Sequence, residues 1–247
     1  MSKFLAIILA AAVAYPVQAQ QVPFPESDLA TGTRFKRLPE NVARDESRMM
    51  QKRIVKCSVY RNKDLARQIL INSDPVTIDF VALDVDKDDL MDELDISDCI
   101  GRSMKNSTYR MQMRFQYQTL RALMAEEVYL MDFNAPPAPA ATAGTAVSGR
   151  SKDRLVHPRA EQIAGLADCL VFHGPAAADA LLRSTIASDA EHEAIEALYP
   201  ALQSCGMNST EEVVLDYSMV RQVIADGLWT RSHYGDEGSP QASEDDA

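Results

Sequence analysis

Apolar residues recur every three to four positions along most of the chain, which is the spacing of one face of an α-helix. Residues 76–83 are rich in β-branched side chains, but Val76, Phe80 and Leu83 share a helical face, so a helix is favoured there too. The pattern predicts an all-α protein with little or no sheet. The clearest stripes are Met113, Tyr117, Leu120, Met124 and Met131 with Val128 at the edge, and Tyr217, Val220, Ile224 and Leu228.

Three polar positions indicate where helices begin. Asp74 followed by Pro75 is typical of an N-cap with proline in the first helical position. Ser188 with Glu191, and Ser209 with Glu212, have the spacing of a capping box, in which each side chain bonds the backbone of the other residue. We therefore expect helices to start at Pro75, directly after Ser188 and directly after Ser209.

Two segments one hundred residues apart share a pattern: YQTLRALMAEEVY begins at Tyr117 and YSMVRQVIADGLW at Tyr217. Earlier landmarks match in the same order, at an offset of 112 residues for the first cysteine of each half and 106 residues for the second. Because the order is shared, the matches predict an internal duplication. Each copy is expected to be a small unit of about four helices.

The predicted organisation has six segments. Residues 133–153 are rich in Ala and Pro and lack the apolar content to pack, which is typical of a flexible linker. The acidic C-terminal residues favour a disordered tail. We expect a signal peptide at 1–19, an irregular segment at 20–39, helical unit 1 at 40–132, the linker at 133–153, helical unit 2 at 154–234 and the tail at 235–247.

The N-terminal residues have the features of an export signal. Lys3 is followed by an apolar run over 4–15 and by small residues that allow cleavage after Ala19. This run is shorter than the roughly 20 residues that cross a bilayer. We expect a periplasmic or secreted protein without a transmembrane segment.

Four cysteines in an exported chain predict two disulfides, and four cysteines allow three pairings. The duplication favours one bridge inside each copy, Cys57 with Cys99 and Cys169 with Cys205. Bridges between the copies are the alternative.

Charge is distributed unevenly. The formal net charge is -11, which argues against nucleic acid as the main partner. Basic residues are in excess over 34–67 and acidic residues over 74–98, and a Cys57–Cys99 bond would hold these segments close together. One i, i+4 stripe on the basic segment is a candidate anion-binding face. It consists of Arg44, Arg48, Lys52 and Lys56.

The sequence predicts no metal or cofactor. The run over 84–95 opens like a calcium loop with Asp84, Asp86 and Asp88, but lacks the glycine at position six and the glutamate at position twelve. The four histidines are interpreted as having no cysteine or histidine partner at a ligand spacing, and no catalytic motif is found.

The last candidates are two tyrosine–arginine pairs. Tyr117 with Arg121, and Tyr217 with Arg221, are i, i+4 neighbours that we interpret as structural pairs at the rim of the apolar stripe. The alternative is that each pair lines a ligand groove.

The sequence favours a non-catalytic binding protein, of adaptor or inhibitor type, that acts on another envelope protein. One alternative is a cell-envelope hydrolase that uses carboxylates or His173 and His192, for which a deep polar cleft is expected. The second is a binder of an anionic polymer or membrane surface through the basic helix.

Overall fold

The computed structural model describes residues 42–104, 113, 115–138, 143–144, 146, 157–207 and 216–235. These residues belong to one compact unit, 41–247. Its helices are α1 (Arg44–Arg61), α2 (Lys63–Ile71), α3 (Phe80–Leu83), α4 (Leu90–Glu93), α5 (Ile96–Ser103), α6 (Tyr117–Asp132), α8 (Pro158–His173), α9 (Pro175–Arg183), α10 (Asp189–Ala197), α11 (Tyr199–Ser204) and α12 (Tyr217–Tyr234). The described residues contain no strand, only an isolated antiparallel bridge between Ser73 and Ile78. The all-α prediction is confirmed.

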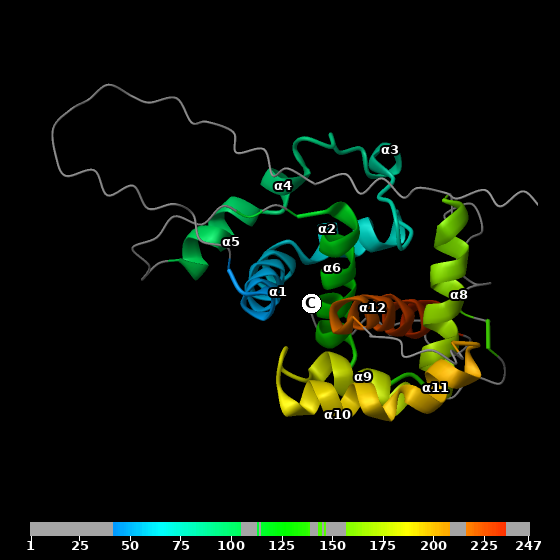
Figure 1. Ribbon diagram of the computed structural model, residues 1–247. Coiled ribbons are helices and arrows are strands. Elements are labelled where there is room, and N and C mark those ends of the chain that lie inside the picture. Colours follow the sequence, from blue (N-terminus) through cyan, green and yellow to red (C-terminus); the bar gives the residue numbers. More distant parts are fainter. Residues whose placement is uncertain are drawn as a thin grey trace, which may run out of the picture. The chain divides into compact units, whose positions relative to one another are not determined.

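Helices α6 and α12 pack against each other at the centre of this unit (Figure 1). Helices α1 and α2 lie against α6, whereas α8 and α9 lie against α12. Residues 120–129 of α6 and 224–232 of α12 are buried without interruption. The predicted apolar stripes therefore do pack into the core, but the polar flanks of both helices are buried too, because each helix is covered from several sides.

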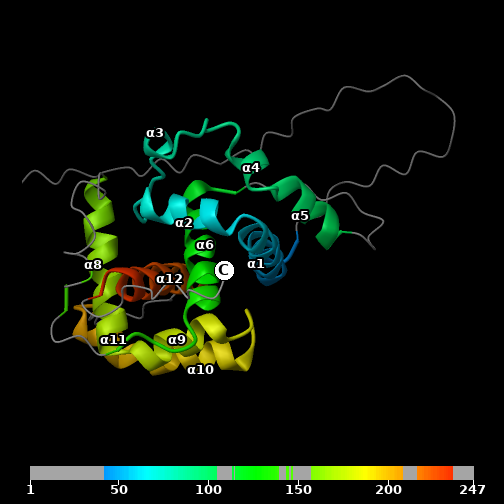
Figure 2. The same cartoon turned by 180° about the vertical axis from the view of Figure 1, so that it is seen from behind.

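Three helices of each half, α1, α2 and α6 and α8, α9 and α12, have similar spacing along the chain. Figure 2 shows these helices from behind. Helix α1 ends at Arg61 and α8 ends at His173, 112 residues later. Helices α2 and α9 both have nine residues, and α9 starts 112 residues after α2. Helices α6 and α12 start one hundred residues apart, at Tyr117 and Tyr217. The predicted stripe began earlier, at Met113, which lies outside α6. The predicted capping box at Ser209 and Glu212 lies outside the described residues.

Both predicted disulfides are confirmed. Cys57–Cys99 joins α1 to α5, with a Cα–Cα distance of 5.8 Å, and Cys169–Cys205 joins α8 to the end of α11, with a distance of 5.9 Å. The bridges close loops of 42 and 36 residues. In the chain-entropy model each loop of this size stabilises the folded state by roughly 4 kcal/mol.

The prediction of a helix that begins at Pro75 is wrong. The Asp74 carboxylate accepts hydrogen bonds from the backbone N–H groups of Val76 (2.7 Å) and Thr77 (2.6 Å), which closes a tight turn instead. Helix α3 begins at Phe80, where the Asp79 carboxylate caps the N–H groups of the next residues. Three β-branched residues in succession, 76–78, disfavour the helix, and Asp79 offers a later cap.

The described part of the predicted linker contacts the helices. The ring of Phe133 stacks on Tyr129 with centroids 5.7 Å apart, and the carbonyl of Phe133 accepts a hydrogen bond of 2.9 Å from Arg183. The backbone N–H of Gly144 donates to Asp168, and Ala146 is fully buried. The remaining linker residues, the predicted signal peptide at 1–19, the segment at 20–39 and the tail after Gly235 lie outside the described residues.

Candidate functional site

Six charged side chains meet where the two halves of the chain contact each other. None has more than 20% of its side chain exposed, and positive and negative groups are equal in number. We call this group the charge cluster. It consists of Arg48 and Lys52 from α1, Glu126 and Glu127 from α6, Glu191 from α10 and Arg221 from α12.

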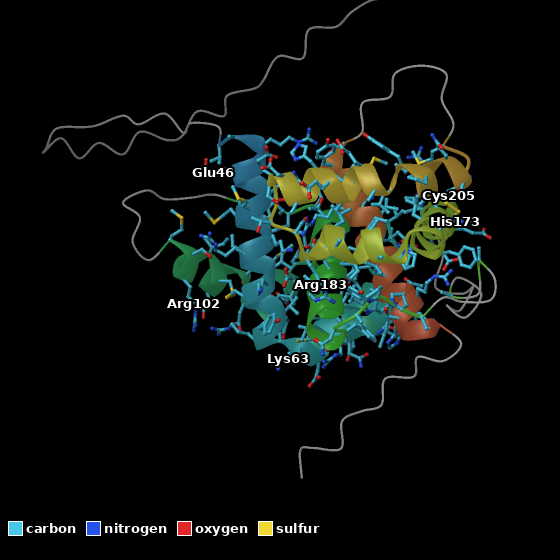
Figure 3. All side chains as sticks on the ribbon, turned by 90° about the horizontal axis from the view of Figure 1, so that it is seen from below. Glu46, Lys63, Arg102, His173, Arg183 and Cys205 are labelled. Carbon is cyan, nitrogen blue, oxygen red and sulfur yellow. A yellow bond between two sulfur atoms is a disulfide. The ribbon has the colours of Figure 1, made fainter. Side chains whose placement is uncertain are left out.

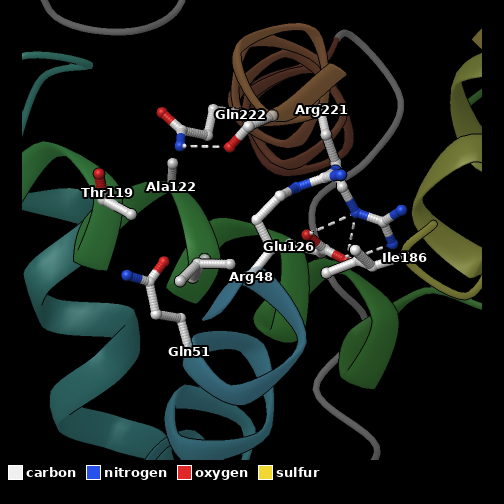
Figure 4. Close-up of a pocket in the computed structure, with 10 residues that line it drawn as sticks. Arg48, Gln51, Thr119, Ala122, Glu126, Ile186, Arg221 and Gln222 are labelled. Atoms are coloured by element: carbon white, nitrogen blue, oxygen red, sulfur yellow. Dashed lines mark hydrogen bonds and ion pairs between the residues drawn. The ribbon is translucent and has the colours of Figure 1, made fainter. Parts of the chain in front are cut away.

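Arg221 binds two carboxylates of the charge cluster, those of Glu126 and Glu191, and Figure 4 draws its bonds to Glu126. Its Nε donates to both carboxylate oxygens of Glu126 at 3.1 Å, and its Nη2 donates to Oε1 of Glu126 at 2.7 Å. Its Nη1 donates to Oε1 of Glu191 at 3.0 Å, and Nη2 also reaches the carbonyl of Leu182 at 2.8 Å. The guanidinium is thereby bonded on every side, which is the arrangement that a buried arginine requires.

Glu191 has a different role from the one predicted. Its backbone N–H donates to the Ser188 hydroxyl at 3.3 Å, so the predicted N-cap is confirmed. Its carboxylate does not complete the capping box; it accepts hydrogen bonds from Arg48 (2.8 Å), Arg221 (3.0 Å) and the N–H of Ala187 (2.8 Å). A fully buried carboxylate gains more from two cations than from one solvent-facing amide.

The surroundings shift the acidities of the two neighbouring glutamates in opposite directions. Burial alone would raise the pKa of Glu126, but the charges of Arg221 and Lys52 outweigh it and lower that pKa below its usual range. Burial raises the pKa of Glu127, with Lys52 opposing the shift. Neither carboxylate oxygen of Glu127 has a hydrogen-bond partner, and Lys52 is 3.7 Å away.

A second buried pair repeats the first with the roles of the helices exchanged. Arg121 of α6 pairs with Asp226 of α12, and its Nε donates to the hydroxyl of Ser73 at 3.0 Å. Arginine and carboxylate are five residues apart on each helix, since Arg121 precedes Glu126 and Arg221 precedes Asp226. Each arginine therefore binds the carboxylate of the opposite helix.

The interpretation of the tyrosine–arginine pairs as rim pairs is wrong. Both arginines are buried, with 1% of Arg121 and 3% of Arg221 exposed. The hydroxyl of Tyr117 donates to the carbonyl of Lys87 at 3.2 Å, and the ring of Tyr217 packs edge-on against His192. An i, i+4 spacing brings the tyrosine and the arginine to one face of the helix. Each arginine is nevertheless buried, because it pairs with a carboxylate of the other central helix.

The predicted basic stripe of α1 is divided between the surface and the interior. Arg48 and Lys52 enter the charge cluster, whereas Arg44 forms an exposed pair with Asp216. Lys56 is exposed and lies 5.7 Å from the centre of the Tyr60 ring. The four cations therefore do not form one continuous face toward solvent.

The acidic run near α4 contacts the basic segment, as predicted from the disulfide. Arg61 Nε donates to the Asp95 carboxylate at 3.1 Å, and its Nη2 lies 3.6 Å from Asp98. The Asp86 carboxylate accepts from the N–H of Asp88 at 2.9 Å and so closes a local turn. These contacts hold the acidic run against the basic segment of α1.

A hollow of about 20 Å³ lies beside the charge cluster, with room for one or two water molecules (Figure 4). Helices α1, α6 and α12 supply most of its walls. It does not have the size of the deep polar cleft expected for a hydrolase. The lining residues are Arg48, Gln51, Thr119, Ala122, Leu123, Glu126, Ile186, Ser218, Arg221 and Gln222.

The two histidines considered for hydrolysis have other surroundings. Nδ1 of His192 lies 2.9 Å from the carbonyl of Ser188. His173 lies beside the disulfide of Cys169 and Cys205. The interpretation that no histidine has a spaced cysteine partner is wrong, because Cys169 precedes His173 by four residues.

No protein family, curated protein or solved structure matches this chain. Among the described residues, no helix has the length and apolar character needed to cross a bilayer.

Proposed function

We propose that the protein is an exported, non-catalytic binding protein whose partner is another protein of the cell envelope. The observation that carries this proposal is the charge cluster. Acidic and basic groups that would serve catalysis are bonded to one another in the interior, beside a hollow for one or two waters. The two disulfides are compatible with an oxidising compartment outside the cytoplasm.

We also propose that the chain arose by duplication of one disulfide-closed helical unit and that the Ala- and Pro-rich segment connects the copies. Helix lengths and offsets support this, as do the reciprocal pairs Arg121–Asp226 and Arg221–Glu126. Reciprocal contacts of this kind are characteristic of an interface between two equivalent units.

Surface positions for partner contact are suggested by exposed apolar side chains. Val81 on α3 is 91% exposed and Met219 on α12 is 63% exposed. Binding to an anionic surface through the basic stripe is less well supported, because Arg48 pairs with Glu191 and Lys52 pairs with Glu126.

Site-specific photo-crosslinking tests the proposal. A photoreactive amino acid replaces Val81 or Met219 in the mature protein, which is then irradiated in extracts of its own cell envelope. Glu196, an exposed polar residue of α10, is the matched control position. We expect one discrete product from at least one apolar position, reduced by excess unmodified protein and missing from Glu196.

The hydrolase alternative is tested with the same preparation. Turnover of a cell-wall or ester substrate that is lost in His173→Ala or His192→Ala would overturn the proposal. So would crosslinking of equal yield and pattern from all three positions.

A further inference from the structure

Three potential metal ligands converge at one end of α8. Cys169 and His173 are one helical turn apart, and Cys205 follows α11 (Figure 3). A sulfur atom from each cysteine and a ring nitrogen of His173 lie within 4.8 Å of one another. His173 is exposed and both cysteines are half-buried, so the group is accessible to solvent. In the oxidised protein the two sulfur atoms are bonded to each other.

We propose that reduction of the Cys169–Cys205 disulfide creates a binding site for a borderline-soft divalent cation such as Zn²⁺. The ligands are the thiolates of Cys169 and Cys205 and a ring nitrogen of His173. The fourth position is open to water, because His173 lies at the surface.

The geometry requires only small movements. Zinc bonds of about 2.3 Å to sulfur and about 2.0 Å to nitrogen place the atoms of a tetrahedral ligand set roughly 3.3 to 3.8 Å apart. The observed separations of up to 4.8 Å are close to this range. After reduction the two sulfur atoms are no longer bonded to each other and must move apart, which brings their separation toward this range. The i, i+4 spacing keeps Cys169 and His173 on one face of α8.

The reaction balances in electrons, protons and charge. A phosphine reductant gives two electrons to the disulfide and leaves as its oxide with the oxygen of one water, whose two protons complete the two thiols. Zn²⁺ then displaces both thiol protons to solvent, because the thiolate is the ligand form. Two thiolates, one neutral imidazole and one dication give a site of zero net charge.

The first half provides an internal comparison. Arg61 follows Cys57 by four residues, as His173 follows Cys169. A guanidinium offers no lone pair to a metal, and Arg61 pairs with Asp95 and Asp98. Cys99 is also fully buried. The proposed site therefore belongs to the second half alone.

The test uses the full mature protein, reduced with a water-soluble phosphine and titrated with Zn²⁺ or Co²⁺. We expect thiolate-to-Co²⁺ charge-transfer absorption, and we expect Zn²⁺ to protect Cys169 and Cys205, but not Cys57 and Cys99, from alkylation detected by mass spectrometry. His173→Ala should weaken Zn²⁺ binding by at least about tenfold, since even outer partners of a ligand contribute that much.

Two controls make the result decisive. Arg61→Ala changes the corresponding residue of the first half and should leave Zn²⁺ affinity unchanged. Protection of all four cysteines alike, as a reduced unfolded chain would give, overturns the proposal. Absence of protection, or equal affinity of His173→Ala and the natural protein, also overturns it.

Discussion

The two buried arginine–carboxylate pairs that join α6 to α12 are equivalent in sequence but differ in their surroundings. Arg221 binds the longer Glu126 through both Nε and Nη2, and Glu126 also receives Lys52 from α1. Arg121 binds the shorter Asp226 and lies 5.8 Å from the centre of the Trp229 ring. One helix pair thus carries the same ionic contact once inside a network of charges and once beside an aromatic ring.

The difference shows that the same ionic contact between α6 and α12 can form in two different surroundings. A buried charge must be paired, so neither arginine can be changed alone at low cost. The groups around each ion pair can differ, as Lys52 beside Glu126 shows. We infer that Glu126 is the more sensitive of the two acids.

Removing the charge of Glu126 should have the largest effect. Glu126→Gln leaves Arg221 and Lys52 buried with one anion fewer, and we expect a loss of about 3 to 5 kcal/mol in unfolding free energy. Asp226→Asn is the matched variant and should lose less. Urea unfolding followed by circular dichroism measures both, and equal losses would contradict the inferred difference.

A double replacement separates charge pairing from packing. Glu126→Met with Arg221→Met removes both charges, so the double variant should be more stable than either single variant. An additive loss would mean that the two side chains act independently.

The next largest effect is expected at a position where α6 and α12 carry side chains of very different size. Gly227 of α12 corresponds to Glu127 of α6, and a Cβ at Gly227 would lie 2.5 Å from the carbonyl oxygen of Ala167. Gly227→Ala should cost about 1 to 3 kcal/mol, because the backbone of α8 must move. Gly165→Ala is the control, since nothing lies near its Cβ position, and it should stabilise by roughly 0.5 to 1 kcal/mol.

Glu127 should make the stability of the folded state depend on pH. Its folded pKa is raised above the ordinary value of 4.5, so the folded state holds a proton more tightly than the unfolded chain. This stabilisation is fully present below pH 4.5 and is lost as pH rises through the folded pKa. Glu127→Gln should therefore gain stability relative to the natural protein as pH rises. Melting curves from pH 4 to pH 8 test this, and a constant difference would contradict it.

The smallest effect is expected at the surface. Arg44 pairs with Asp216, and their side chains are 70% and 43% exposed. Arg44→Ala should change the unfolding free energy by less than about 0.5 kcal/mol. A loss comparable to that of Glu126→Gln would contradict the expected difference between exposed and buried ion pairs.

Some of the candidate site was predictable, and some was not. The disulfide pairing followed from the repeated order of landmarks around Cys57 and Cys169. The i, i+4 spacing of Cys169 and His173 is a signal in the sequence from which their proximity can be predicted. The role of Glu191 was hidden, because its position after Ser188 fits a capping box as well as a buried partner of Arg48.

The sequence by itself determined the helical character of the chain and the pairing of its cysteines, because both depend on spacing along one chain. Only the tertiary structure decided which charged residues are inside. Helical periodicity describes the face that meets the first neighbour, so it predicts Arg121 and Arg221 only at the rim of the apolar stripe. They are buried because the other half of the chain covers that flank and brings a charge of opposite sign to each.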